Sequence, residues 1–449
     1  MKKRIIFTFL IGILLLSSCE KYLEEKPNVR LAIPSKAAEF QSLLDQYNVI
    51  SDRDPSSGEV SAGDTYLTDA DYLTRDDQEK RMYTWQNSNV YKEGSNDWLY
   101  VYVPVYTANS VIEAWQGLSA SDRNQAEWKD VAGQAYLLRA KCFLNAVTLW
   151  GLAYNESTAE AMPGIALRLN ANFNESSKRA SVAQSYNQVL SDLKMAAALL
   201  PVKPMHVVRA SRPAAYGMLA RTYLWMRRYP EARSYADSTL EIKSDLINYN
   251  TLNANLNYPV PQFNAEVIMN NKMLALTTVS VTRAKVNLEL YNQYESNDLR
   301  KTVFFRTVSG TYHFKGNYTA GVIPFSGIAT DECYLIRAEC RVRAGDVAGA
   351  LTDLNRLLIN RYRTGTFVPL ALTDASQLLD RILKERRKEL LYRGLRWADI
   401  KRLNEEGANI SLSRTVNGLK FTLPAKSRRF AMPLPEDLVS LSNMEQNTY

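Results

Sequence analysis

The sequence predicts an all-α-dominated fold in which helical hairpins carry long irregular loop insertions. The 449 residues are 46% hydrophobic and 23% charged, an ordinary globular composition that excludes a disordered or fibrous chain. Glycine and proline are scarce, with 19 and 16 residues, which argues against a loop-rich β architecture. Three segments also share a helical spacing in which an alanine follows a large residue four positions later. Two polar segments of the chain do not have this spacing.

The shared spacing places a large residue, an alanine four positions later, and usually a second large residue. It occurs in three segments: Tyr136, Ala140 and Phe143; Tyr216, Ala220 and Tyr223; and Tyr334, Ala338 and Arg341. Residues three and four apart lie on one helix face, and alanine there lets a partner helix approach closely. In the second helices of the last two hairpins, Ala232 and Ala350 are as far apart in the chain as Ala220 and Ala338 are in the first helices. This arrangement is typical of tetratricopeptide-like hairpins, although any antiparallel helix pair would share part of it.

Long insertions must emerge between the hairpins, because the copies are much further apart than the roughly 34 residues of a tandem repeat. The hairpin scaffold is expected around residues 100–243 and 329–403, whereas residues 48–97 and 244–328 are rich in Asn, Asp, Ser, Thr and Gly. We expect loops, short helices and a small β-hairpin near residues 304–318 in these insertions. Function is expected on the insertions, because binding residues are concentrated on loops held by a rigid scaffold.

The N-terminus has the pattern of an export signal. Lys2, Lys3 and Arg4 precede an apolar run from Ile5 to Leu16, which is too short to span a ~30 Å hydrocarbon layer as a helix. Leu16-Ser17-Ser18-Cys19 resembles the lipobox of bacterial lipoproteins, and the acidic residues that follow resemble a surface-export signal. We therefore predict a signal peptide over residues 1–18, lipidation of Cys19 and a single domain over residues 19–449. The alternative is an ordinary cleaved signal with an unrelated cysteine.

Charge and motif content exclude several classes of protein. The formal charge of +8 is spread along the chain without a basic block, so a nucleic-acid partner is not expected. The chain has only two histidines and contains no HExxH, GxSxG, P-loop or GxGxxG motif. We predict a protein that is not an enzyme, with no catalytic residues, no metal site and no cofactor.

Two groups of aromatic residues in the insertions are candidate ligand contacts. Trp85, Tyr91 and Trp98 are flanked by amides and carboxylates, and a second group contains Tyr291, Tyr294 and Tyr312. Flat aromatic faces cover apolar ligand surface, while amides and carboxylates fix orientation by hydrogen bonds. Core packing is the alternative for each ring taken alone. Nearby Tyr100, Val103 and Tyr106 sit at helical spacing and are expected to be core residues.

The segment from Leu378 to Leu403 interleaves arginines and lysines with carboxylates at three- and four-residue spacing. This pattern favours ion pairs along a helix and to its neighbours; the alternative is an anion-binding site. Glu385-Arg386-Arg387-Lys388-Glu389-Leu390 and Gly394-Leu395-Arg396-Trp397-Ala398-Asp399-Ile400-Lys401-Arg402 resemble the characteristic helix of SusD/RagB outer-membrane lipoproteins. The family usually has an acidic residue where this chain has Arg393, so one ion pair must be rearranged.

Three further blocks carry the same resemblance: Tyr136-Leu137-Leu138-Arg139-Ala140, the segment Asp331–Glu339, and the ending with Met432-Pro433-Leu434-Pro435 and Gln446-Asn447-Thr448-Tyr449. The resemblance implies a SusD-like α-superhelix and a non-catalytic lipoprotein on the outer membrane, exposed at the cell surface. It also implies a SusC/RagA-like TonB-dependent transporter as partner. The implied ligand is an oligosaccharide. Peptide capture of the RagB type and a repeat scaffold without a small ligand are the alternatives.

Overall fold

The computed structural model describes residues 34–172, 174–274 and 277–449. The fold is mostly helical, with 48% helix and 18 α-helices among the described residues, so the predicted fold class is confirmed. Residues 1–18 and Cys19, for which we predict a signal peptide and lipidation, lie outside the described residues. No helix within the described part of the chain is both long enough and apolar enough to cross a membrane.

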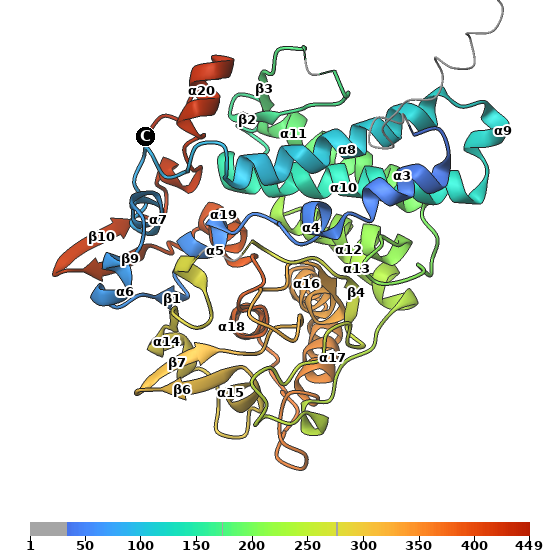
Figure 1. The fold of residues 1–449 in the computed structure, drawn as a ribbon. Coiled ribbons are helices and arrows are strands. Elements are labelled where there is room, and N and C mark those ends of the chain that lie inside the picture. The colour runs from blue at the N-terminus through green and yellow to red at the C-terminus, as the bar shows by residue number, and fades with distance from the viewer. Residues whose placement is uncertain (1–33, 173, 275–276) are drawn as a thin grey trace, which may run out of the picture.

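The long helices form a stack in which consecutive helices pack on one another, apart from the last two (Figure 1). They are α8 (Asp97–Gly117), α10 (Ala126–Trp150), α11 (Val182–Leu199), α12 (Arg212–Trp225), α13 (Tyr229–Ile242), α16 (Thr330–Arg343), α17 (Val347–Leu358), α18 (Ala375–Glu389) and α19 (Arg396–Glu405). The pairs α10–α11, α12–α13 and α16–α17 are hairpins, while α11 contacts α12 and α13 contacts α16. The three hairpins therefore follow one another in space, despite the insertion between α13 and α16.

The alanines of the predicted spacing lie at the helix contacts. Ala140, Ala220 and Ala338 are fully buried, as are Ala232 and Ala350 in the second helices of two hairpins. A methyl group at each of these positions leaves room for the neighbouring helix. The spacing found in the sequence therefore marks the packed faces of the stack.

Short elements fill the insertions, the connection between α8 and α10, and the first and last parts of the described chain. The short α-helices are α3 (Ala37–Leu44), α4 (Tyr47–Ile50), α5 (Ser57–Ser61), α6 (Asp69–Leu73), α7 (Asp77–Tyr83), α9 (Ala120–Arg123), α14 (Leu288–Tyr291), α15 (Arg300–Val303) and α20 (Glu436–Ser442). Three 3-10 turns are η2 (Tyr249–Thr251), η3 (Thr277–Val279) and η4 (Arg428–Phe430). The insertions thus follow the expectation of loops and short helices.

All described strands form two-stranded antiparallel ribbons. They are β1 (Thr65–Tyr66) with β5 (Lys285–Val286), β2 (Pro163–Ala166) with β3 (Arg179–Ser181), β4 (Val267–Met269) with β8 (Ile328–Ala329), β6 (Phe305–Val308) with β7 (Thr311–Phe314), and β9 (Leu412–Val416) with β10 (Leu419–Leu423). The β6–β7 hairpin confirms the one predicted near residues 304–318. Ser309 and Gly310 both have positive φ at its turn, as a tight two-residue hairpin turn requires.

Buried ion pairs join the second insertion, residues 244–328, to the C-terminal helices. Arg300 is fully buried and lies 2.7 Å from Asp298, 2.7 Å from Glu385 and 2.8 Å from Glu389. Arg361 is likewise buried and bridges Glu389 to Glu266 in the insertion, at 2.7 Å from each. The interpretation of the segment Leu378 to Leu403 as a salt-bridged packing segment is confirmed.

The unusual Arg393 has its own buried partner. Its guanidinium lies 3.1 Å from Asp331 in α16 and covers the rings of Tyr318 and Phe325 at 4.8 and 4.5 Å from their centroids. An arginine here therefore connects α16 with the end of the second insertion.

The C-terminal residues are fixed beside the C-terminal end of α10. Asn447 donates through Nδ2 to the carbonyls of Trp150 and Met432, and Arg179 donates to Asn447 Oδ1 at 3.0 Å. The backbone N–H of Met432 donates to Leu149 O at 2.8 Å. Asn447 thus anchors the end of the chain beside α10.

Candidate ligand-binding site

The two insertions meet at the N-terminus of α8, and a pocket of about 210 Å³ opens there. Its walls come from α5, α7, the loop that precedes α8, and Leu274 of the second insertion. Glu79 of α7 accepts hydrogen bonds from the Thr277 hydroxyl at 2.8 and 2.7 Å, which ties the two insertions together beside the pocket. We call this the α8 pocket.

The start of α8 is held by side-chain caps. Asn96 Oδ1 accepts from the backbone N–H groups of Trp98 and Leu99 at 3.0 and 3.3 Å, which satisfies two of the free donors at the helix start. Asp97 is buried and accepts from the backbone N–H of Ser57 at 2.9 Å and from its hydroxyl. Burial raises the pKa of Asp97, although these hydrogen bonds oppose the rise. The floor of the pocket is therefore fixed by α5 and α8 together.

The rim of the α8 pocket combines an aromatic ring with charged groups of both signs. Tyr100 is half-buried, its hydroxyl lies 3.0 Å from Ser95 Oγ, and the Arg53 guanidinium lies 5.7 Å from its ring centroid. Lys92 pairs with Asp76. Burial opposes ionisation of Asp76, yet its pKa is lowered because Lys92 and the backbone of Glu79 bind the carboxylate. This set can cover an apolar ligand face and exchange several hydrogen bonds with hydroxyl or amide groups.

Three of the predicted contact residues lie in the core. Trp85 is 4% exposed and donates through its indole N–H to Ser61 O at 3.0 Å. Tyr91 is 7% exposed, so only its edge reaches the α8 pocket, and burial raises its pKa well above the usual range. Tyr294 is 1% exposed and donates to Lys388 O at 2.8 Å. None of the three therefore presents a free ring face to a ligand.

The other three predicted residues are half-buried but lie in two different places. Trp98 stacks on Tyr102, with ring centroids 4.4 Å apart, and lines a second pocket of about 260 Å³ with Arg168, Asn170 and α20 residues. Tyr291 and Tyr312 stack on each other at 3.4 Å, so each covers one face of the other. The structure thus brings Tyr291 and Tyr312 together and places Trp98 apart from them.

The expectation that Tyr100, Val103 and Tyr106 are core residues is wrong. Val103 and Tyr106 are 40% and 41% exposed, and Tyr100 reaches the α8 pocket. Helical spacing showed that the three residues share a face, but the buried face of α8 is the one carrying Val101, Val105, Ala108 and Ile112. Sequence reasoning therefore missed Tyr100 as a site residue, and no sequence signal pointed to Arg53.

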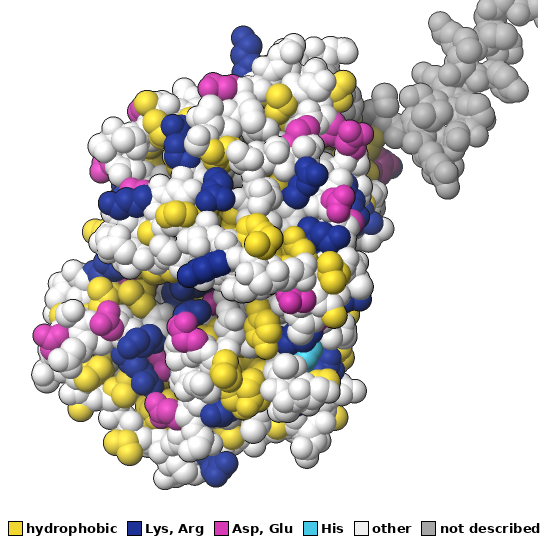
Figure 2. All heavy atoms as spheres, turned by 90° about the vertical axis from the view of Figure 1, so that its left-hand side faces the viewer, with side chains coloured by type: hydrophobic (Ala, Val, Ile, Leu, Met, Phe, Trp, Pro, Cys, Tyr) yellow, Lys and Arg dark blue, Asp and Glu magenta, His cyan; other side chains and the backbone are white. Residues whose placement is uncertain are grey.

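Charge is mixed on the face that carries α6, α7 and the β9–β10 hairpin. Figure 2 shows basic and acidic side chains interspersed there, with apolar side chains between them. Such a surface suits a ligand that is recognised by hydrogen bonds rather than by net charge.

The fold is a helical scaffold that carries a polar and aromatic pocket where its insertions meet. Residues 21–224 match a SusD-like family described as starch-binding and associating with the outer membrane, and residues 284–447 match the SusD family. The chain therefore belongs to the SusD/RagB family, as the resemblance implied. Proteins of this family associate with the outer membrane and are non-catalytic binding proteins.

Solved structures with the same fold share little sequence with this chain. A SusD superfamily protein from Bacteroides thetaiotaomicron superposes with a TM-score of 0.73 at 21% identity, covering 92% of this chain and 98% of that protein. One from Bacteroides fragilis gives 0.73 at 18% identity over 92% and 99%. A SusD-like carbohydrate binding protein from Bacteroides vulgatus gives 0.67 at 18% identity over 91% and 97%. No curated protein matches the chain.

Proposed function

We propose that this chain is a cell-surface lipoprotein that captures an oligosaccharide and delivers it to a SusC-like TonB-dependent transporter. The observation that carries the proposal is the α8 pocket, because it lies where both insertions of a SusD-family scaffold meet. Its half-buried tyrosine, amide, hydroxyl and mixed charges suit a sugar, which offers an apolar ring face and many hydroxyl groups.

The lipid anchor is proposed at Cys19, after removal of residues 1–18. Several acyl chains on one residue hold a protein stably at a membrane, whereas one chain does so only marginally. Cys19→Ala should therefore move the full chain from the outer-membrane fraction to the soluble fraction and abolish its labelling by a palmitate analogue. Retention at the membrane with unchanged labelling would contradict the anchor.

The transporter is proposed as partner from family membership, with the helical repeats as the docking face. Co-purification of the full chain with a SusC-like barrel from the native outer membrane tests this part of the proposal. Absence of any such barrel from a crosslinked, detergent-solubilised complex would contradict it.

Ligand capture is tested by calorimetry on the soluble form, which starts after Cys19, against a panel of oligosaccharides and mixed peptides. We expect oligosaccharide binding that Tyr100→Ala weakens about tenfold or more, because the ring and its hydroxyl line the α8 pocket. Trp98→Ala reports on the second pocket, and Val103→Ala, on the exposed side of the same helix, is the matched control.

Each alternative function has its own result in this experiment. Peptide binding with no response to sugars would assign the protein to capture of the RagB type. Binding to the transporter without affinity for either class would favour a repeat scaffold. Binding that survives Tyr100→Ala but is lost in Trp98→Ala would move the ligand to the second pocket.

A further inference from the structure

A pocket of about 560 Å³ lies between α14, α18, the start of α19 and the loop that leads into β9. It is larger than the α8 pocket, and its volume is in the range of small-molecule sites, roughly 300–1,000 Å³. Leu403 and Leu412 form part of its apolar wall. Lys384, Arg387 and Arg396 bring three positive charges to the same space. We call it the Arg396 pocket.

One buried carboxylate stands between the two arginines of this pocket. Asp64 is 3% exposed, and its Oδ1 atom lies 2.8 Å from Nε and from Nη2 of Arg387. Its Oδ2 atom lies 3.8 Å from Nε of Arg396. Glu59, the neighbouring buried carboxyl, adds no second negative charge at neutral pH, because burial and Asp64 raise its pKa to about 8. Two guanidinium groups therefore share a single carboxylate.

Arg396 is the cation without a close partner. Its side chain is 15% exposed, and its 3.8 Å contact with Asp64 is too long for a hydrogen bond. The guanidinium donates to no acceptor in the described part of the chain. Only its Nε atom is fully enclosed by protein, which leaves the two Nη atoms to meet an acceptor from the pocket.

The surroundings of Arg396 disfavour its positive charge. Burial lowers the pKa of the guanidinium and the nearby Arg387 lowers it further, which together outweigh the opposing effect of Asp64. A largely buried charge is costly unless a group of opposite sign compensates it. An anionic group that entered the pocket would supply the missing compensation.

Lys384 adds a second positive group on the same side. It lies three residues before Arg387 on α18, so the two side chains share a helix face. Lys384 is exposed and forms no ion pair with any residue that the structure describes. Two carboxylates, Asp380 and Glu289, also line the pocket, but they are exposed and are screened by water and salt.

The balance of charge in the pocket thus differs from that of the surface around it. The face that carries the β9–β10 hairpin has mixed charge (Figure 2). The buried wall of the pocket has an excess of one positive charge. A ligand that reaches this wall is therefore selected by its own negative charge.

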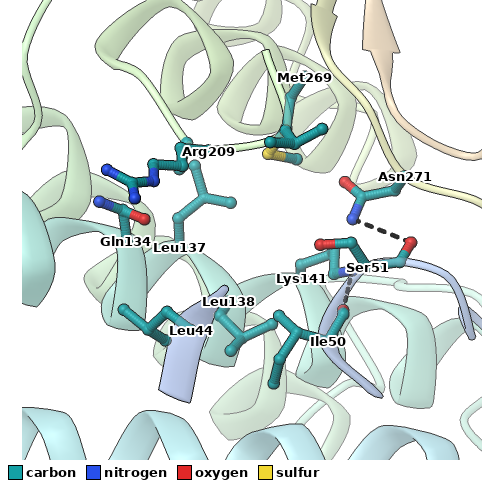
Figure 3. Close-up of a pocket in the computed structure, with 12 residues that line it drawn as sticks. Leu44, Ile50, Ser51, Gln134, Leu137, Leu138, Lys141, Arg209, Met269 and Asn271 are labelled. Atoms are coloured by element: carbon teal, nitrogen blue, oxygen red, sulfur yellow. Dashed lines mark hydrogen bonds between the residues drawn. The ribbon is translucent and has the colours of Figure 1, made fainter. Parts of the chain in front are cut away.

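Lys141 shows the contrasting case of a cation that needs no ligand. It lines a small cavity of about 40 Å³ beside α10, shown in Figure 3. Its ammonium group donates to Asp54 at 2.6 Å and to Ile50 O at 3.3 Å. A space of this size holds a water molecule or two. Arg396 has neither a close carboxylate nor a carbonyl acceptor, and its pocket is far larger.

We propose that the Arg396 pocket binds the anionic group of an acidic saccharide, a carboxylate or a sulfate, with Arg396 and Lys384 as its charged partners. The planar guanidinium can donate two parallel hydrogen bonds to such a group, while the lysine supplies a point charge. Leu403 and Leu412 would cover apolar parts of the sugar. The saccharide part of the proposal rests on the proposed function, whereas the anion site itself does not.

Inorganic sulfate is the first probe, because it tests the anion site without any sugar. Thermal unfolding of the soluble form, which starts after Cys19, is measured in sodium sulfate and in sodium chloride at equal ionic strength. Bound sulfate raises the melting temperature, but sulfate also stabilises proteins because it is excluded from their surface. The gain in sulfate should therefore be about 2 °C larger for the wild type than for Arg396→Gln. Equal gains would overturn the proposal.

The same measurement in chloride separates binding from a structural role. Arg396→Gln removes a poorly compensated charge that makes no hydrogen bond, so it should unfold at the temperature of the wild type or above it. A lowered melting temperature with an unchanged response to sulfate would show that Arg396 only supports the fold, and would overturn the proposal.

Lys384→Gln is the second variant, because an exposed residue can be changed without loss of the fold. It should lose part of the gain that is specific to sulfate. Lys194→Gln, at an exposed lysine within α11, is the matched control and should respond to sulfate as the wild type does. Equal responses of Lys384→Gln and Lys194→Gln would contradict the role of Lys384.

Calorimetry distinguishes the two sources of the anion. One pair of probes is an oligogalacturonate and its methyl ester, and the other is a sulfated oligosaccharide and its desulfated form. In one of the pairs the charged form should bind about tenfold or more tightly than the neutral form, and Arg396→Gln should abolish the difference. Absence of a charge preference in both pairs would overturn the assignment to an acidic saccharide.

The outcomes also separate this inference from the proposed function. A response to sulfate that needs Arg396, with no binding of any oligosaccharide, would support the anion site and contradict the proposed function. Binding of a neutral oligosaccharide that is lost in Tyr100→Ala, with no sulfate-specific gain in the wild type, would do the reverse.

Discussion

The first long helices and the C-terminal helices are both well packed, but by different chemistry. Between α8, α10 and α11 the buried faces carry residues such as Phe143, Val147 and Leu193. Around α16, α18 and α19 the fully buried side chains include Arg300, Arg361 and Arg402. The first region is held mainly by burial of apolar surface, with a buried ion pair between Arg139 and Asp192 joining α10 to α11. The second region is held by a network of ion pairs that fixes an insertion against the helix stack.

This difference decides how each region responds to substitution and to pH. Apolar packing is non-directional and does not titrate. A buried ion pair is weak evidence for net stability, but removing one partner leaves an uncompensated charge in a low-dielectric interior. The C-terminal region should therefore be the more sensitive one to single changes in charge.

Arg300→Met is expected to have the largest effect. The substitution leaves Asp298, Glu385 and Glu389 without their shared cation. The free energy of unfolding, measured by urea denaturation, should fall by about 3–5 kcal/mol. The control is Arg233→Met, because that guanidinium is 36% exposed and lies 3.3 Å from Asp346. It should cost less than about 1 kcal/mol. Equal losses in the two variants would contradict the comparison.

Leu193→Ala probes the apolar region. The side chain is fully buried in α11, and its truncation should cost about 3 kcal/mol through lost burial and the cavity left behind. Because no charge is involved, the loss should be the same at pH 5 and pH 8. The matched control is Leu441→Ala in α20, an exposed leucine that should change stability by less than about 0.5 kcal/mol.

Glu59→Gln tests the pH dependence at the contact between α5 and α19. Burial raises the pKa of Glu59 to about 8, and the neighbouring Asp64 adds to the rise. The fold therefore favours the protonated carboxyl. The protonated Glu59 carboxyl makes its full contribution to stability below the unfolded pKa of about 4.3. This contribution is lost as the pH rises through 8, by up to about 1.4 kcal/mol per pH unit.

Glutamine keeps an oxygen for the Gly394 N–H, which lies 3.0 Å from Glu59 Oε2, and it does not ionise. The variant should accordingly lose less stability than the wild type between pH 5 and pH 8 in thermal unfolding. Parallel curves for the two proteins would show that Glu59 is not the titrating group.

Leu99→Ser combined with Val103→Ser should have the smallest effect. Both side chains are 40% exposed on the outer face of α8, so each change should alter stability by less than about 0.5 kcal/mol. A loss of several kcal/mol in chemical denaturation would restore the idea that this face of α8 is core.

The helix stack was predictable because its pattern is local. Alanine four residues after a large side chain gives a close helix contact wherever it occurs, and Ala140, Ala220 and Ala338 all lie at such contacts. The sequence predicts that ion pairs form in the segment Leu378 to Leu403, but not which residues pair. The spacing of Glu385 and Glu389 indicates paired charges, but their shared partner Arg300 is 85 and 89 residues away.

The residues of the candidate site were harder to predict, because polar neighbours in sequence do not report burial. Trp85 is flanked by polar residues, yet its ring lies in the core and the Arg414 guanidinium covers it at 4.6 Å. Helical spacing predicts that Tyr100 is a core residue, but Tyr100 reaches a pocket because α8 buries a neighbouring stripe of side chains.

The way the C-terminus is fixed has a consequence for the order of folding. Asn447 donates to Trp150 O across 297 residues of chain. Contacts of such separation are slow to form, because the entropy of closing a long loop must be lost before the contact contributes. The end of α10 cannot reach its final surroundings until the last residues of the chain arrive. The packing around α8 and α10, the first long helices to be synthesised, is therefore among the last parts of the fold to be completed.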